Sequence, residues 1–187
     1  MTANSTQIVK GSIAQIAKET GTSIAEAWFN VNAIILVDIS ASMDDLARAG
    51  KTRWEVAQEE LKNLQNSLPG KLAVIAFSED ATFCPTGAIP PTQSTTEMGK
   101  ALRFAHIADS IKGMRFIVIS DGEPTDESDA LDAAGKFKNK IDTIYVGPET
   151  GSGRDFLKKL AAKSGGTFML KPELLYLADG VHGLLGA

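Results

Sequence analysis

The sequence predicts an α/β fold, in which a doubly wound, mostly parallel open sheet of six strands carries helices on both faces and has one antiparallel edge strand. Short, fully apolar runs alternate along the chain with segments of helical periodicity. Continuous apolar runs of this length are typical of parallel strands that are buried on both faces. Their alternation with helices implies right-handed crossovers, which place helices on either side of the sheet.

Six apolar runs are expected to form the strands of this sheet. Five of them are separated by helical segments and should be parallel: residues 34–37, 72–77, 116–119, 141–146 and 167–170. The sixth, residues 81–84, follows residue 77 too closely for a crossover helix. We therefore expect it to pair antiparallel with the preceding strand.

The segments between the runs carry helix signals. Thr52 and Glu55 form a capping box at the start of one helix, and Pro69-Gly70 ends it. Thr125 or Asp126 is expected to cap a later helix. Further helices are expected at apolar positions with helical spacing around Met98, Leu102 and Ala105, around Leu157, Leu160 and Ala161 after Ser152, and at the C-terminus around Leu174, Leu177, Val181 and Leu184.

The chain is expected to divide into an N-terminal helical extension, residues 1–30, and one domain, residues 31–187. Val9, Ile13 and Ile16 form an apolar stripe, Gly21 is a candidate helix C-cap, and Ser23 opens a second capping box. Leaving such a stripe in water costs roughly 1.5–3 kcal/mol for each large apolar side chain. We therefore expect both helices to dock on the domain.

Composition excludes several classes of function. The chain has 187 residues, 43% of them hydrophobic, and a net charge of −4 without a dense Lys/Arg run, which argues against a nucleic-acid partner. A single cysteine, Cys84, allows neither an intrachain disulfide nor a zinc site of the CxxC type. Neither an apolar run of about 18 residues nor a signal-peptide pattern is present, so no membrane association and a cytoplasmic location are expected.

Polar oxygen donors follow the ends of two expected strands. Asp38, Ser40 and Ser42 leave the first strand at alternate positions, and Asp121-Gly122 follows the fourth strand, residues 116–119, in the same way. Ligand sites in parallel α/β sheets form outside the carboxyl ends of the strands. Ser94 to Met98 open a helix between them. Two carboxylates with hydroxyls, without His or Cys, suit Mg²⁺, Mn²⁺ or Ca²⁺.

This ordered set of residues resembles the metal-ion-dependent adhesion site of von Willebrand factor A domains. The resemblance covers roughly residues 31 to 187 and includes the segments Thr96-Glu97-Met98-Gly99-Lys100-Ala101-Leu102 and Ile119-Ser120-Asp121-Gly122-Glu123-Pro124. It implies a Rossmann-like sheet and one bound cation, taken here as Mg²⁺, Mn²⁺ or Ca²⁺. The implied metal site is Asp38, Ser40, Ser42, Thr96 and Asp121, in which the hydroxyls bind directly and the carboxylates act mainly through water.

Two assignments within this resemblance have rivals. Thr95 competes with Thr96, because the family usually has glycine at the Thr95 position; alignment to Met98 and Leu102 favours Thr96. Asp44-Asp45 resembles the paired aspartates that hold a second metal in integrin β-subunit I-like domains, but it lies one residue nearer to Asp38. A solvated charge pair at a helix start is the favoured interpretation.

The resemblance implies a metal-dependent protein-binding module, not an enzyme, whose metal accepts an Asp or Glu carboxylate of a protein partner. Bacterial intracellular members of the family often serve AAA+ ATPases or multi-protein assemblies. One alternative is a metal-dependent hydrolase or phosphatase on a similar sheet. Haloacid-dehalogenase-type phosphatases need an aspartate where this chain has Ser40, and serine is a poor general acid near neutral pH. A structural protein with a vestigial site is the other alternative.

Overall fold

The computed structural model describes residues 7–48, 50–146 and 151–170, and these residues form one six-stranded sheet with a separate small hairpin. The strand order in the sheet is β5-β4-β1-β6-β7-β8. The strands are β1 (Ala33–Asp38), β4 (Leu72–Phe77), β5 (Ala81–Phe83), β6 (Arg115–Ser120), β7 (Ile141–Tyr145) and β8 (Phe168–Leu170). All neighbours are parallel except β4 and β5. The predicted fold class, including its antiparallel edge strand, is confirmed.

The connections reverse direction at β1. After β1 the chain builds β4 and β5 on one side, and it then crosses to place β6 on the other side. Asp38 lies beside Phe77 of β4, and Val37 lies beside Ile119 of β6. The carboxyl ends of β1 and β6 are therefore neighbours at the topological switch point of the sheet, where ligands bind in folds of this kind.

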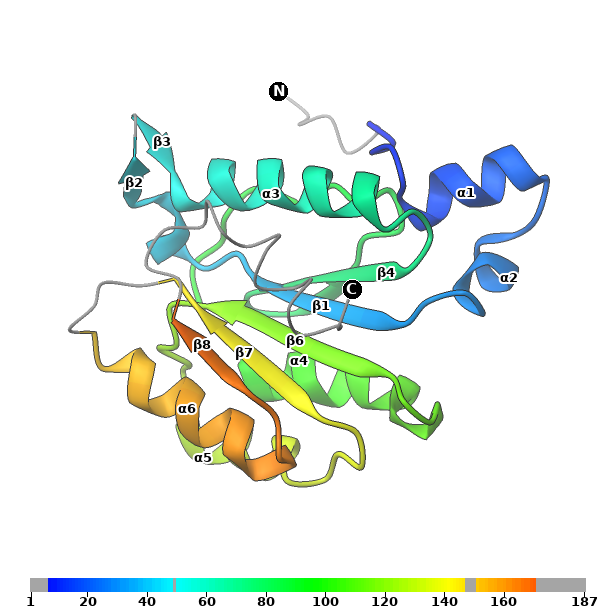
Figure 1. Ribbon diagram of the computed structural model, residues 1–187. Helices are drawn as coiled ribbons and strands as arrows, with labels where there is room; N and C mark the ends of the chain where they lie inside the picture. The colour runs from blue at the N-terminus through cyan, green and yellow to red at the C-terminus, as the bar shows by residue number, and fades with distance from the viewer. Residues whose placement is uncertain (1–6, 49, 147–150, 171–187) are drawn as a thin grey trace.

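Helices cover both faces of the sheet, as Figure 1 shows. One face is covered by α3 (Arg53–Ser67), and the other by α4 (Met98–Ala105), α5 (Glu127–Ala134) and α6 (Gly153–Ser164). Alternate residues of β1 divide between the two layers: Ile35 and Val37 belong to the core under α3, whereas Leu36 belongs to the core under the other three helices. Burial on both faces explains why the strands are fully apolar.

The first two helices, α1 (Ile13–Thr20) and α2 (Ile24–Trp28), pack at the end of the sheet that lies opposite the β2–β3 hairpin (Figure 1). Ile13 is 2% exposed and belongs to the core. The Gly11 backbone approaches α3 closely at φ +80°, and a Cβ at this position would lie 1.9 Å from the Gln65 carbonyl oxygen. The segment therefore docks, while the domain boundary at residue 30 stays a prediction.

Local details differ from the expected elements in several places. The hairpin of β2 (Leu46–Arg48) and β3 (Lys51–Thr52) and the short 3-10 helices η1 (Ala41–Asp44) and η2 (His106–Ser110) were not expected. Both capping boxes form, and Asp126 caps α5. The Ser152 hydroxyl donates to Glu123 instead of capping α6. The expected C-terminal helix lies outside the described residues. Within those residues, each helix is too short or too polar to cross a membrane.

Candidate metal centre

Asp38 is the most enclosed residue of the candidate site. It ends β1 and is fully buried. Its Oδ1 accepts the Ser40 N–H at 2.8 Å, and its Oδ2 accepts the Ser120 hydroxyl at 2.6 Å. Burial raises the pKa of this carboxyl from 3.8 to about 6; the two hydrogen-bond partners oppose the rise, and the nearby charge of Asp121 adds to it. At neutral pH the chain therefore holds a buried negative charge that a cation would stabilise.

Ser40 and Ser42 present their hydroxyls together just beyond Asp38. Ser40 has extended backbone, with φ −65° and ψ 168°, and starts η1, which turns the chain so that Ser42 follows one step later. The two hydroxyl oxygens lie 3.1 Å apart. Ser40 is buried and Ser42 is half-buried. The tight turn thus brings two neutral oxygen donors to the same point, which an extended strand alone would not ensure.

Thr96 reaches the same region through the segment that precedes α4. The Gln93 N–H donates to the Ile39 carbonyl at 2.7 Å, which holds this segment against the end of β1. Thr96 accepts the Thr125 N–H at 3.0 Å, and its own N–H donates to the Thr125 hydroxyl at 3.4 Å. The loop after β6 therefore holds Thr96 directly, and the end of β1 holds the segment that leads to it.

Among the described residues, neither the Thr95 nor the Thr96 hydroxyl has a hydrogen-bond partner. Thr96 is 7% exposed, and its hydroxyl makes no hydrogen bond to any described residue. The Thr95 Oγ1 is buried and has no hydrogen-bond partner among the described residues. An unpaired buried hydroxyl is costly, and this cost applies to the Thr95 Oγ1. The choice of Thr96 over Thr95 stays a prediction.

Asp121 and Gly122 form the turn after β6. Asp121 is 7% exposed, and Gly122 has φ +77°, a backbone conformation that favours glycine. A Cβ on Gly122 would lie 2.3 Å from the Gly153 carbonyl oxygen, so α6 starts directly against this turn. The Gly122 N–H donates to the Ser120 hydroxyl at 2.9 Å, which fixes the hydroxyl that binds Asp38.

Comparison with known proteins identifies the fold. No protein-family model and no curated protein matches the sequence. Among solved structures, an aerotolerance-related membrane protein from Bacteroides fragilis is 18% identical with a TM-score of 0.65, and the match covers 83% of this chain and 98% of that one. A von Willebrand factor type A structure from Catenulispora acidiphila is 20% identical with a TM-score of 0.59, over 83% of this chain and 42% of that one.

This chain has the von Willebrand factor A-type fold. The manganese-loaded TRAP protein of Plasmodium vivax shares it, with 18% identity, a TM-score of 0.59 and coverage of 83% of this chain and 73% of that one. At these identities the likeness establishes the arrangement of helices and strands.

Within this von Willebrand factor A-type fold, Asp38 is the last residue of β1, and the other four predicted site residues lie just after β1, just after β6 and just before α4. The structure adds three residues that the sequence did not assign. Ser120 orients Asp38, Thr125 holds Thr96, and the Arg53 guanidinium Nη1 lies 3.6 Å from Asp121 Oδ2. Ser120 precedes Asp121 and could have been found from the strand pattern. Arg53 could not, because the unexpected β2–β3 hairpin brings it to the site.

The donor set fits a hard divalent cation. The described residues contain no cluster of three or more His, Cys, Asp or Glu side chains, so a cation here would depend on hydroxyl oxygens beside Asp38 and Asp121. Hydroxyl and carboxylate oxygens suit Mg²⁺, Mn²⁺ or Ca²⁺. The neighbouring Asp44 and Asp45 have separate partners: Asp44 accepts the Thr92 hydroxyl at 2.7 Å, and Asp45 lies 3.3 Å from Arg53 Nη1.

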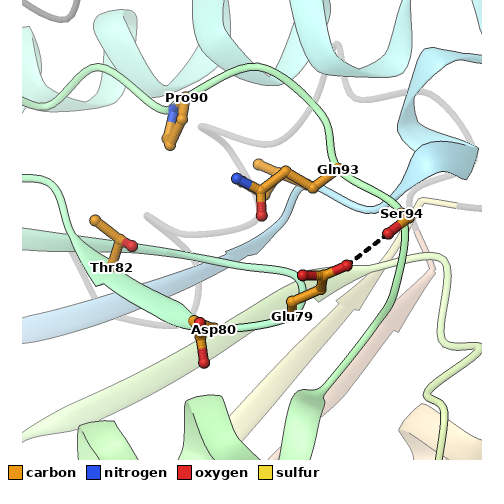
Figure 2. A pocket seen from close by; sticks show the side chains of 7 residues that line it. Glu79, Asp80, Thr82, Pro90, Gln93 and Ser94 are labelled. Carbon is orange, nitrogen blue, oxygen red and sulfur yellow. Dashed lines mark hydrogen bonds between the residues drawn. The ribbon is translucent and has the colours of Figure 1, made fainter.

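An acidic hollow lies directly beside the candidate metal centre. Its volume is about 500 Å³, and Figure 2 shows the polar side chains that surround it. The Ser94 hydroxyl donates to Glu79 at 2.7 Å across one side. The lining consists of Ile39, Glu79, Asp80, Thr82, Pro90, Gln93 and Ser94. Because Ile39 follows Asp38, the carboxylates of Glu79 and Asp80 place negative charge near the end of β1.

Proposed function

We propose that this chain is a protein-binding module that depends on a divalent cation, through which it binds a carboxylate of its partner. The observation that carries the proposal is the fully buried Asp38 at the sheet's switch point, held by the Ser40 N–H and the Ser120 hydroxyl beside Asp121. A buried carboxylate next to a second one is costly without a cation.

The proposed ligands divide into two kinds. Ser40, Ser42 and Thr96 supply neutral oxygens directly, while Asp38 and Asp121 act mainly through water. One Mg²⁺, Mn²⁺ or Ca²⁺ would supply a positive charge with open coordination positions, since Mg²⁺ takes about six oxygen ligands. The TRAP structure with the same fold is manganese-loaded, which supports a cation of this class.

The proposed partner is a protein that contributes an Asp or Glu. A carboxylate combines a hard oxygen with the negative charge that neutral hydroxyls leave uncompensated. The family resemblance favours an AAA+ ATPase or a multi-protein assembly as the partner. Neither a nucleic acid nor a membrane is proposed as a partner, and a cytoplasmic location is the corresponding prediction, which cell fractionation tests.

We further propose that the chain does not catalyse a reaction at this site. Phosphoryl hydrolysis with an aspartate nucleophile needs a positioned acid or base. The position two residues after Asp38 holds Ser40, whose hydroxyl lies 3.1 Å from the Ser42 hydroxyl. No observation favours the hydrolase alternative. A vestigial site is the remaining alternative, and it predicts that no cation binds.

The experiment that tests the proposal is isothermal titration with Mg²⁺ and Mn²⁺ of the wild-type chain and two adjacent variants. Thr96→Val should weaken binding about tenfold or more, because it removes a direct ligand while keeping the size of the side chain. Thr95→Val is the matched control and should leave the affinity unchanged. The same loss in both variants, or in Thr95→Val alone, would contradict the ligand assignment. Absence of binding to the folded wild-type chain would refute the metal proposal.

A further inference from the structure

Arg53 lies against the candidate metal centre from the first turn of α3. Its Nη1 donates to the Ser42 carbonyl at 3.1 Å and lies 3.6 Å from Asp121 Oδ2. The side chain is 15% exposed, so its charge acts in a partly desolvated environment, where Coulomb interactions are stronger than in bulk water. Arg53 thus joins the two loops that carry Ser42 and Asp121.

The backbone holds Arg53 in this position. Its N–H donates to the Asp45 carbonyl at 3.0 Å, and the Thr52–Glu55 capping box fixes the first turn of α3. Asp45 Oδ2 also lies 3.3 Å from Nη1, but the Asp45 side chain is 66% exposed. Water screens that pair strongly. The Asp121 side chain is 9% exposed, so its attraction to Arg53 is screened much less.

The formal charges around the site show what Arg53 changes. Asp38 and Asp121 carry two negative charges, which a divalent cation alone would balance. With the partly buried positive charge of Arg53 included, a site that holds the cation has one surplus positive charge. The exposed Asp45 carboxylate is left out of this count because water screens it. One carboxylate from outside removes that surplus. Arg53 should therefore oppose the binding of a cation by itself and favour a cation that is bound together with an anion.

We propose that Arg53 couples cation binding to carboxylate binding at this site, so that a free carboxylate increases the affinity of the site for the cation. This inference depends on the proposed function, because it requires a cation between these residues. Arg53 acts through charge and by positioning the Ser42 loop. The coupling is reciprocal by thermodynamic linkage. The carboxylate increases the affinity for the cation by the same factor by which the cation increases the affinity for the carboxylate.

The test uses Mn²⁺ alone and sodium acetate as the carboxylate. The dissociation constant of Mn²⁺ is measured by titration calorimetry in sodium chloride and in sodium acetate at equal ionic strength, with correction for the Mn²⁺–acetate complex. For the wild-type chain, acetate should lower the dissociation constant of Mn²⁺ about fivefold or more, within the usual range for coupled sites. Arg53→Gln should bind Mn²⁺ more tightly than wild type in chloride, and acetate should change its affinity less than about twofold.

Two further variants separate charge from other effects. Arg53→Lys keeps the charge and should keep most of the acetate effect. Arg103→Gln removes an exposed arginine that pairs with Asp129 on the α4–α5 surface, and it should behave as wild type. Circular dichroism and thermal unfolding establish that each variant is folded; if Arg53→Gln is not, Arg53→Met replaces it.

The outcomes distinguish this inference from the proposed function. If the folded wild-type chain does not bind Mn²⁺ in either salt, the proposed function fails. If wild type binds Mn²⁺ but acetate leaves its affinity unchanged, or if Arg53→Gln shows the full acetate effect, the coupling role of Arg53 is wrong while the metal site stands.

Discussion

Replacing Asp38 by asparagine should have opposite effects on stability with and without a divalent cation. Burial raises the Asp38 pKa from 3.8 to about 6, so the folded chain holds the ionised carboxylate less favourably than the unfolded chain does. At about 1.4 kcal/mol for each pH unit, this difference destabilises the cation-free protein by about 3 kcal/mol above pH 6. Asparagine removes the charge and can still accept the Ser40 N–H.

The pH dependence of this effect has a definite sign. Because the folded pKa lies above the unfolded one, the contribution of Asp38 to stability is fully present below pH 3.8 and is lost as the pH rises through about 6. In chelator at pH 7.5, Asp38→Asn should therefore be more stable than wild type by up to about 3 kcal/mol, and by about half as much at pH 5. Urea unfolding in EDTA at the two pH values measures this difference.

Adding Mg²⁺ should make wild type more stable than Asp38→Asn, because a ligand stabilises only the chain that binds it. Wild type should gain stability with Mg²⁺ concentration, while Asp38→Asn should not. Asp142→Asn is the control: Asp142 is also fully buried, but it pairs with Arg115 and accepts the Thr167 N–H at 2.7 Å, so its loss should destabilise the protein in both buffers. The reasoning is refuted if Asp38→Asn is less stable than wild type in EDTA at pH 7.5, or if Mg²⁺ stabilises both equally.

Three other predictions concern the turn, the docked helices and the absence of catalysis. Gly122→Ala should lower the free energy of unfolding by at least about 2 kcal/mol, because φ is +77° and a Cβ would lie 2.3 Å from the Gly153 carbonyl oxygen. The control Gly165→Ala, at φ +71° with open space around it, should lower it by about 1 kcal/mol. Equal losses of stability in urea unfolding would contradict this prediction. Ile13→Ala should cost about 2–5 kcal/mol, and amides of residues 13 to 17 should exchange slowly; rapid exchange would mean that α1 does not stay docked. Phosphate esters should not be hydrolysed above background with Mg²⁺ at neutral pH, and activity that Asp38→Asn abolishes would overturn the non-enzymatic proposal.

The helix capping residues and the strand periodicity were readable without a structure because both are local. The side chains of Thr52 and Glu55 each accept the backbone N–H of the other residue within one helical turn, and Ser23 and Glu26 do the same. Fully apolar runs identified the strands because both faces of the sheet are covered. The β2–β3 hairpin was missed because it pairs only a few residues and lacks an apolar alternation. Helix α4 starts at Met98, within the expected segment, and its N-cap residue Glu97 makes no side-chain cap hydrogen bond.

The sequence by itself determined the fold class and the positions of the apolar runs that form the strands, since these depend on residue type and spacing. The oxygen donors Asp38, Ser40, Ser42, Thr96 and Asp121 stay a prediction that rests on the family resemblance. Tertiary structure alone decided that Ser120 donates to Asp38 and that Arg53 lies beside Asp121. Ser120 and Asp38 are 82 positions apart in the sequence, and Arg53 and Asp121 are 68 apart. Their distances depend on sheet register and on the hairpin before α3, so spacing along the chain could not reveal them.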